Sequence, residues 1–268
     1  FRTLTTESLA VFIPFKVQEI QDKGGIYFGE NAISHNLILC NKANLLNQSA
    51  FYLGVPGAGK SFAVKELIAF LMLHPDYADD DILICDPEGE FGALVKTLGR
   101  EKATVAHLVA GGKDRLNAMY MVEGYGENNP IVEKSQFVMS LCEQLMKPEP
   151  VGAKERSIIG RCVGNVYREY IKDYRNPPTL KDFREELLRQ PEPEAKRIAT
   201  ALELYCTGSL NLFNHPTNVN LNSRVVCFVL KGMGENLRKI AMHITNDFVT
   251  SAVGTNFKNG VATWCYFD

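Results

Sequence analysis

Residues 54–61 read Gly54-Val55-Pro56-Gly57-Ala58-Gly59-Lys60-Ser61 and match the pattern G-x-x-x-x-G-K-[ST] at every fixed position. The glycines let the backbone wrap closely, so that consecutive N–H groups point at phosphate oxygens. Lysine supplies a mobile positive charge for the β and γ phosphates, and the serine hydroxyl is a ligand for Mg²⁺. The segment therefore predicts a phosphate-binding loop for ATP with Mg²⁺.

The residues around the loop have the pattern that such a loop requires. Residues 50–53 are a short apolar run and predict a strand. Residues 61–73 return their apolar side chains to one side, which predicts a helix whose N-terminal amides and dipole add to the phosphate site. Phe62, the residue after the serine, completes the predicted nucleotide-binding set.

The rest of the chain alternates apolar runs with helical patterns. This alternation predicts a mostly parallel sheet covered on both faces, as in a RecA-like P-loop NTPase of the α/β class. Apolar runs at residues 9–15, 26–29 and 36–40, with a Gly24-Gly25 turn signal, predict an antiparallel lead-in sheet before the loop. The expected strands after the loop are residues 82–85, 104–109, 224–230 and 261–267, and the expected helices among them are residues 91–98 and 235–253.

Strand signals vanish between residues 130 and 206. Proline pairs separate four helical patterns there, at about residues 131–146, 153–174, 180–190 and 194–205. Thr179 followed by Asp182 resembles a capping box. The segment therefore predicts an all-helical insertion. The expected organisation is a β lead-in over residues 1–49, the first part of the NTPase core over 50–127, the insertion over 128–210 and the second part of the core over 211–268.

Composition excludes few functions. With 46% hydrophobic residues, 22% charged residues and a net charge of −2, the chain has ordinary globular composition and gives no electrostatic argument for nucleic acid. Seven cysteines without a C-x-x-C pair predict buried free thiols in a reducing compartment. No signal peptide or apolar run of about 18 residues is present, so we expect a cytoplasmic protein. The start at Phe1 rather than Met leads us to expect a fragment.

Two aspartates compete for the role of the Mg²⁺-binding carboxylate that a triphosphatase needs at the end of a strand. Asp86 and Asp268 each follow four apolar residues. Glu88 and Glu90, close after Asp86, are candidates for the base that orients the attacking water. A strand-end aspartate also serves as an ordinary turn residue, and that alternative stays open for both.

Several segments together resemble the conjugative-transfer ATPases of type IV secretion systems, which belong to the HerA–FtsK superfamily of hexamer-forming motors. The resemblance covers nearly the whole chain and is greatest for the TraC/TraE type from conjugative elements of Gram-positive bacteria. It rests, in chain order, on GVPGAGKSF, ILICDPEGEF, DRLNAMY, PTLKDFREELLRQPEPEA, TGSLNLFNHPTNV and TWCYFD.

The resemblance implies roles for particular residues. It gives the Mg²⁺-binding role to Asp268, downstream of a helical insertion, and places the Asp86–Glu90 segment beside the nucleotide. In that family a catalytic glutamate, a sensor residue and further motor motifs come next. This chain ends at Asp268, so we expect it to bind nucleotide better than it hydrolyses it. An arginine finger from a neighbouring subunit is also implied, and its candidate donors are Arg156, Arg161 and Arg224. Each of these is more typical of a surface or helix-pairing arginine than of a finger.

The implied partners are other subunits of a secretion or conjugation complex, DNA, and further copies in a dimer or homo-hexamer, at the inner face of the cell membrane. Three functions stay open at this point. The first is a motor ATPase that drives channel assembly or transport, related to DNA-translocating ATPases. The second is an assembly subunit in which ATP is a structural switch. The third is a small-molecule kinase that uses Asp86.

Overall fold

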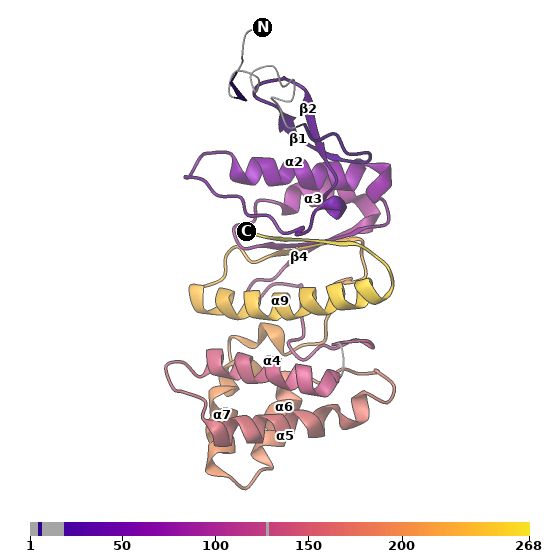
Figure 1. The fold of residues 1–268 in the computed structure, drawn as a ribbon. Coiled ribbons are helices and arrows are strands. Elements are labelled where there is room, and N and C mark those ends of the chain that lie inside the picture. Colours follow the sequence, from indigo (N-terminus) through magenta and orange to yellow (C-terminus); the bar gives the residue numbers. More distant parts are fainter. Residues whose placement is uncertain (1–4, 7–18, 127–128) are drawn as a thin grey trace. The chain divides into compact units, whose positions relative to one another are not determined.

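A computed structural model describes residues 5–6, 19–126 and 129–268 (Figure 1). The chain forms two compact units, Phe1–Ala78 and Asp79–Asp268, and each is described by itself. The apolar run at residues 9–15, expected as a strand of the lead-in, lies outside the described residues.

The first unit contains the predicted antiparallel pair. Strand β1 (Ile26–Glu30) pairs with β2 (Leu37–Cys40), with Ile26 opposite Cys40. Helix α2 (Lys60–Leu73) contacts β1 and buries Leu67, Ile68 and Leu71. The short 3₁₀ helices η1 (Lys42–Asn44) and η2 (Pro75–Tyr77) complete the unit. The predicted helix after the loop is therefore confirmed.

The strand expected at residues 50–53 is absent. These residues have no regular secondary structure, and the side chains of Phe51 and Leu53 are 89% and 90% exposed. The prediction was wrong because apolar composition alone does not make a strand, which also needs a neighbour for its backbone groups.

The second unit is built on a four-stranded parallel sheet in the order β4-β5-β3-β6. The strands are β3 (Asp81–Asp86), β4 (Ala103–His107), β5 (Val225–Val229) and β6 (Thr263–Phe267). The central strand β5 is buried at every position and β3 at every position but its first, as expected for continuous apolar runs covered on both faces.

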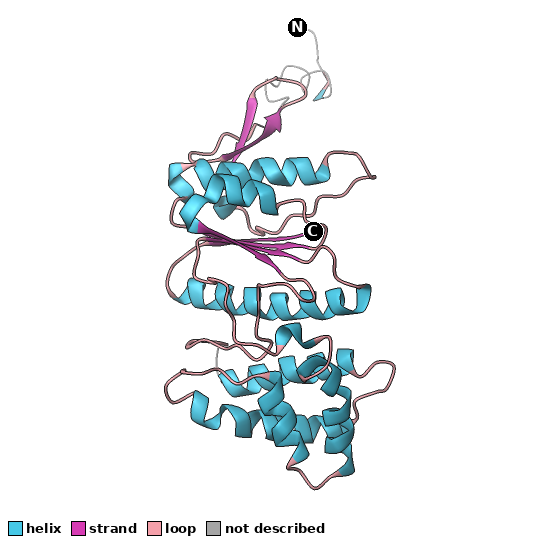
Figure 2. Ribbon diagram, turned by 180° about the vertical axis from the view of Figure 1, so that it is seen from behind, coloured by secondary structure: helices cyan, strands magenta, loops and turns pink. Residues whose placement is uncertain are grey.

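Helices cover both faces of this sheet (Figures 1 and 2). Helix α3 (Gly92–Gly99) packs on β4 and β5 and is followed by η3 (Arg100–Lys102). Helix α9 (Glu235–Lys258) contacts β3 and β6 on the opposite face, and it runs five residues beyond its predicted end. The mostly parallel α/β fold of a P-loop NTPase is confirmed.

Helices fill the range expected for the insertion, and its described residues contain no strand. Helix α4 packs on both α9 and α5, and α6 and α7 pack against α5. The capping box of Thr179 and Asp182 is present at the start of α6. The helices are α4 (Pro130–Leu145), α5 (Ala153–Tyr170), α6 (Leu180–Leu188), α7 (Pro193–Ala201), α8 (Glu203–Cys206) and η4 (Asn211–Phe213).

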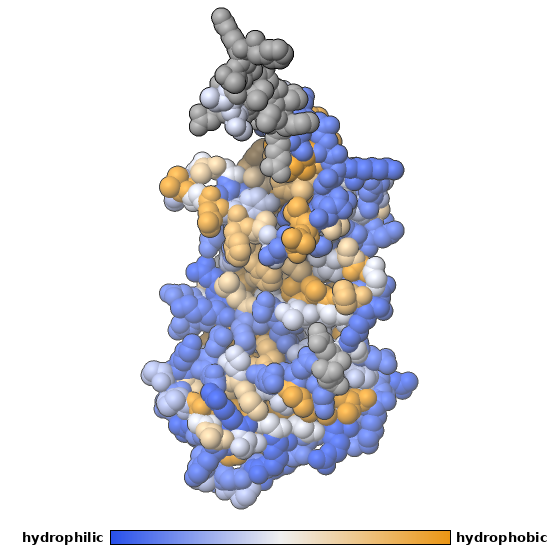
Figure 3. Space-filling view, viewed as in Figure 1, coloured by the Kyte–Doolittle hydropathy of each residue, from blue (hydrophilic) through white to orange (hydrophobic). Residues whose placement is uncertain are grey.

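Two details of these helices differ from the prediction. Helix α5 ends at Tyr170 rather than at Tyr174, which has a φ of +52° and cannot continue a right-handed helix. The single helix expected at residues 194–205 is interrupted at Leu202. The surface of this helical part is mostly hydrophilic in Figure 3, with apolar residues scattered among polar ones.

The cysteines follow the prediction with one exception. All seven are free, and six are buried. Cys265 is exposed because it lies on β6, an edge strand of the sheet within the described residues. Among the described residues, no helix combines the length and apolarity that crossing a membrane demands.

Candidate nucleotide-binding residues

The predicted phosphate loop leads directly into α2 in the first unit. Gly57 and Gly59 have φ values of +80° and +85°, a left-handed conformation that side-chain-bearing residues rarely adopt. Gly59 is the N-cap of α2, and Ala63 N–H donates to its carbonyl as the first helical bond. The amides of Lys60, Ser61 and Phe62 therefore have no acceptor inside the helix, which makes this end suited to an anion.

The side chain of Lys60 folds back over the loop. Its Nζ donates to Gly54 O at 2.9 Å and to Val55 O at 3.2 Å, which holds the positive charge at the loop rather than in solvent. No atom lies within 4 Å of a Cβ built at Gly57 or Gly59, so both glycines border open space. Amides, an ammonium and a hydroxyl, without a carboxylate, fit a polyanionic triphosphate.

The two aspartates proposed for Mg²⁺ end neighbouring strands of the second unit. Cys85 pairs with Phe267, and Asp268 N–H donates to Cys85 O at 3.3 Å, which extends the pairing to the last residue. Asp86 and Asp268 therefore lie at the same carboxyl end of the sheet. Glu88 and Glu90 follow β3 in the loop at this end.

Asp86 and Asp268 differ in their surroundings. Asp86 is fully buried: its Oδ1 accepts from Glu90 N–H at 2.8 Å, and its Oδ2 accepts from Phe91 N–H at 2.9 Å and Gly92 N–H at 3.3 Å. Both carboxylate oxygens therefore hold the turn into α3, as expected if Asp86 is a strand-end turn residue rather than a metal ligand. Asp268 is exposed.

The other carboxylates at this edge are exposed as well. Glu88 is ion-paired to Arg238 at 3.2 Å, and its side chain is 63% exposed. The Glu90 side chain is exposed, while its amide is bound by Asp86. Lys231 reaches the same loop, since a Cβ at Gly89 would lie 2.9 Å from its Cδ. The sequence prediction missed Arg238 and Lys231, although Lys231 follows closely on the apolar run of β5.

The three candidate arginine fingers all have partners inside the chain. Arg156 is ion-paired to Glu143 at 2.8 Å and Arg161 to Glu192 at 2.6 Å, on exposed helix surfaces. Arg224 precedes β5 and donates its Nε to Asp80 O at 3.0 Å. It therefore lies at the amino end of the strands, opposite to Asp86 and Asp268.

The described part of the chain has no group of three or more His, Cys, Asp or Glu side chains arranged to hold a metal ion.

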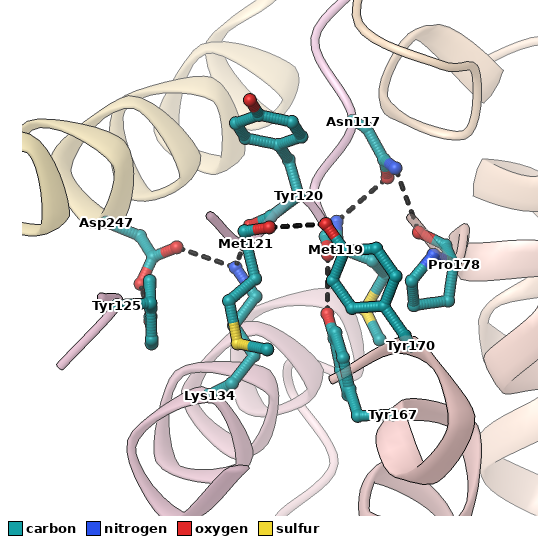
Figure 4. Close-up of polar contacts among 10 residues, drawn as sticks. All are labelled: Asn117, Met119, Tyr120, Met121, Tyr125, Lys134, Tyr167, Tyr170, Pro178 and Asp247. Atoms are coloured by element: carbon teal, nitrogen blue, oxygen red, sulfur yellow. Dashed lines mark hydrogen bonds and ion pairs between the residues drawn. The ribbon is translucent and has the colours of Figure 1, made fainter. Parts of the chain in front are cut away.

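The sequence analysis missed a second polar cluster, between the sheet layer and the helical part, which we call the Lys134 cluster (Lys134, Asp247 and Tyr125). Lys134 of α4 is fully buried and lies 2.7 Å from Asp247 of α9. Tyr125 OH donates to the other Asp247 oxygen at 2.5 Å, and Lys134 Nζ also donates to Tyr120 O at 2.9 Å (Figure 4). Burial lowers the pKa of Lys134, and Asp247 opposes that shift. The available signal was a charged residue within an apolar helical stripe.

The comparisons with known proteins concern the fold. No family model and no curated protein matches the sequence. Among solved structures, VirB4 of Thermoanaerobacter pseudethanolicus matches with a TM-score of 0.75 and 17% sequence identity, over 94% of this chain and 78% of that chain. At this identity the likeness is one of fold, and the chain therefore has the α/β P-loop fold found in VirB4.

Proposed function

We propose that this chain is the ATP-binding part of a motor ATPase of a type IV secretion or conjugative DNA-transfer system. The observation that carries the proposal is the complete phosphate-loop motif, with Lys60 folded over the loop and α2 beginning at Gly59. The shared fold with VirB4 supports the choice among P-loop proteins, as does the ordered set of motifs that resembles conjugative-transfer ATPases.

Residues 54–62 bind the phosphates in this proposal. The loop amides and Lys60 neutralise the phosphate oxygens, and the Ser61 hydroxyl and the Asp268 carboxylate hold Mg²⁺, which offsets charge on the β and γ phosphates. We assign Asp268 rather than Asp86 to the metal because both oxygens of Asp86 already accept hydrogen bonds from backbone amides.

The water-orienting role is assigned to the acidic loop after β3. Glu88 and Glu90 are the two candidates, and Glu88 is ion-paired to Arg238 at 3.2 Å. The expected partners are other subunits of a secretion or conjugation complex, further copies of the chain in a dimer or hexamer, and DNA, on the cytoplasmic side of the membrane. An assembly subunit that binds ATP without turnover is the alternative.

The test compares Lys60→Ala with Lys96→Ala, an exposed lysine of α3. Removing a charge-assisted contact of about 1.5–3 kcal/mol should weaken ATP binding roughly 10- to 100-fold. Calorimetric titration with Mg-ATP and phosphate release measure the two properties. Unchanged affinity and turnover in Lys60→Ala would sink the proposal. Phosphate release by the unaltered protein that is lost in Lys60→Ala would count against the assembly subunit.

A further inference from the structure

A cavity of about 250 Å³ lies in the second unit at the amino ends of the strands. Its lining includes Asp81, the first residue of β3, Ser223 just before β5, and residues 244–256 of α9. Because a six-residue strand spans about 17 Å, the cavity is separate from Asp86 and Asp268 at the other end. It is therefore not part of the nucleotide-binding residues described above.

The cavity has apolar walls and a small number of polar groups, as ligand sites usually do. Leu83, Leu116, Met121 and Phe248 supply apolar surface. Thr255 and Asn256 of α9 also line the cavity.

Tyr120 and Met121 form part of one wall of the cavity, and the backbone of this segment is held by hydrogen bonds from α4 and α5. Tyr167 OH and Tyr170 OH of α5 each donate at 2.5 Å, to Met119 O and Met121 O. Lys134 Nζ binds Tyr120 O, and Figure 4 shows the Tyr120 ring pointing away from these contacts. The cavity is thus formed by a segment whose backbone is fixed from α4 and α5, which makes it pre-organised for a ligand.

The charge of the lining is negative. No lysine or arginine is among the described residues that line the cavity. Asp247 lines it, but Lys134 and Tyr125 occupy both of its oxygens. Asp81 accepts one bond, from Asn256 Nδ2 to Oδ2 at 2.7 Å. Burial raises the pKa of Asp81, and the Asn256 bond and the Arg224 charge only partly oppose this rise.

We propose that this cavity binds a compact organic cation with an apolar body, whose positive head group pairs with Asp81 while its body contacts the apolar walls. The volume limits the ligand to about the size of one substituted aromatic ring. A cation is favoured over a neutral molecule because it compensates a carboxylate that is partly removed from water. The site goes beyond the proposed ATPase function and does not depend on it.

Benzamidine, an aromatic amidinium, is the probe, and benzoate is the anion of matched shape. Titration of the full chain without nucleotide, followed by amide chemical shifts, should move the signals of Leu116 and Ser223 with benzamidine and leave the signal of Gly57 in the phosphate loop in place. Benzoate should cause no such shift. Because no ATP is present, a failure of ATP binding does not affect the result.

Asp81→Asn should weaken benzamidine binding about tenfold, the value of one charge-assisted hydrogen bond. Asp79→Asn is the control, since Asp79 is an exposed aspartate two residues away. Ser251→Leu, which fills the cavity without changing its charge, should abolish binding and serves if Asp81→Asn does not fold. Three results would each overturn the proposal: equal binding of benzoate, equal affinity of the Asp79→Asn and Asp81→Asn variants, or full binding by Ser251→Leu. The absence of any shift at about 10 mM benzamidine, roughly ten times a Kd of about 1 mM, would also overturn it.

Discussion

Two groups of charged side chains in the second unit differ in their exposure to solvent. At the carboxyl end of the sheet, Glu88 and Asp268 are exposed to solvent. In the Lys134 cluster, the lysine side chain is fully buried and Asp247 is 14% exposed, with both carboxylate oxygens bonded. Glu88 forms an exposed ion pair with Arg238, and because such pairs contribute little to stability, this carboxylate can exchange its partner for a ligand. A buried ion pair must find its hydrogen-bond partners within the protein, so it supports the structure and has few polar atoms left to bind a ligand.

The largest effect on stability should come from Lys134→Met. This change leaves Asp247 buried without its cation, which costs roughly 3–5 kcal/mol of the free energy of unfolding. Lys196→Met, at an exposed lysine of α7, should change it by about 0.5 kcal/mol or less. Urea denaturation measures both.

A double variant, Lys134→Met with Asp247→Leu, sharpens this result. Removing both charges should recover much of the lost stability, since a buried pair gains little over apolar groups of similar volume. Equal midpoints for Lys134→Met and Lys196→Met would show that burial of this pair has no structural role.

An intermediate effect is expected for Asp86→Ala. Three backbone N–H groups of the turn into α3 lose their acceptor, and unsatisfied buried donors cost about 1–3 kcal/mol. The control is Asp114→Ala, which removes an acceptor from the single amide of His107 in an exposed position. If Asp86→Ala lost Mg-ATP binding with no loss of stability, Asp86 would be the metal ligand instead of a turn residue.

The smallest stability effect belongs to Asp268→Asn. Because this side chain is exposed, the free energy of unfolding should change by about 0.5 kcal/mol or less. The affinity for Mg²⁺ should fall, since an amide is a poorer ligand for Mg²⁺ than a carboxylate, so ATP binding should need a higher Mg²⁺ concentration. Titration of Mg²⁺ at fixed ATP measures it, and an unaltered Mg²⁺ requirement would remove Asp268 from the proposed site.

Features that are determined by residues close together in the sequence could be predicted. The spacing of Gly54, Gly59 and Lys60 predicted a loop whose glycine conformation the structure contains, and Thr179 with Asp182 predicted a cap that is present. Buried parallel strands were recognisable because they are apolar at nearly every position. These features depend on neighbours a few residues apart in the chain.

Features that depend on distant partners could not be predicted. Lys134 and Asp247 are separated by 113 positions, and nothing near either residue indicates its partner. Residues 50–53 have the apolar composition of a strand but form none. Asp86 and Asp268 both follow four apolar residues, yet Asp86 is buried and Asp268 is exposed. In each case the outcome is set by what the rest of the chain places beside the residue.

The tyrosines that hold the carbonyls of Met119 and Met121 have a consequence for cooperativity. They attach the segment between the sheet and the helices to α5, while Lys134 attaches it to α4 and α9. Separating the helical part from the sheet would break all of these bonds together and leave several polar groups buried without partners. The inserted helices and the parallel sheet should therefore lose their structure in one step, as a single cooperative folding unit rather than as a core with a detachable appendage.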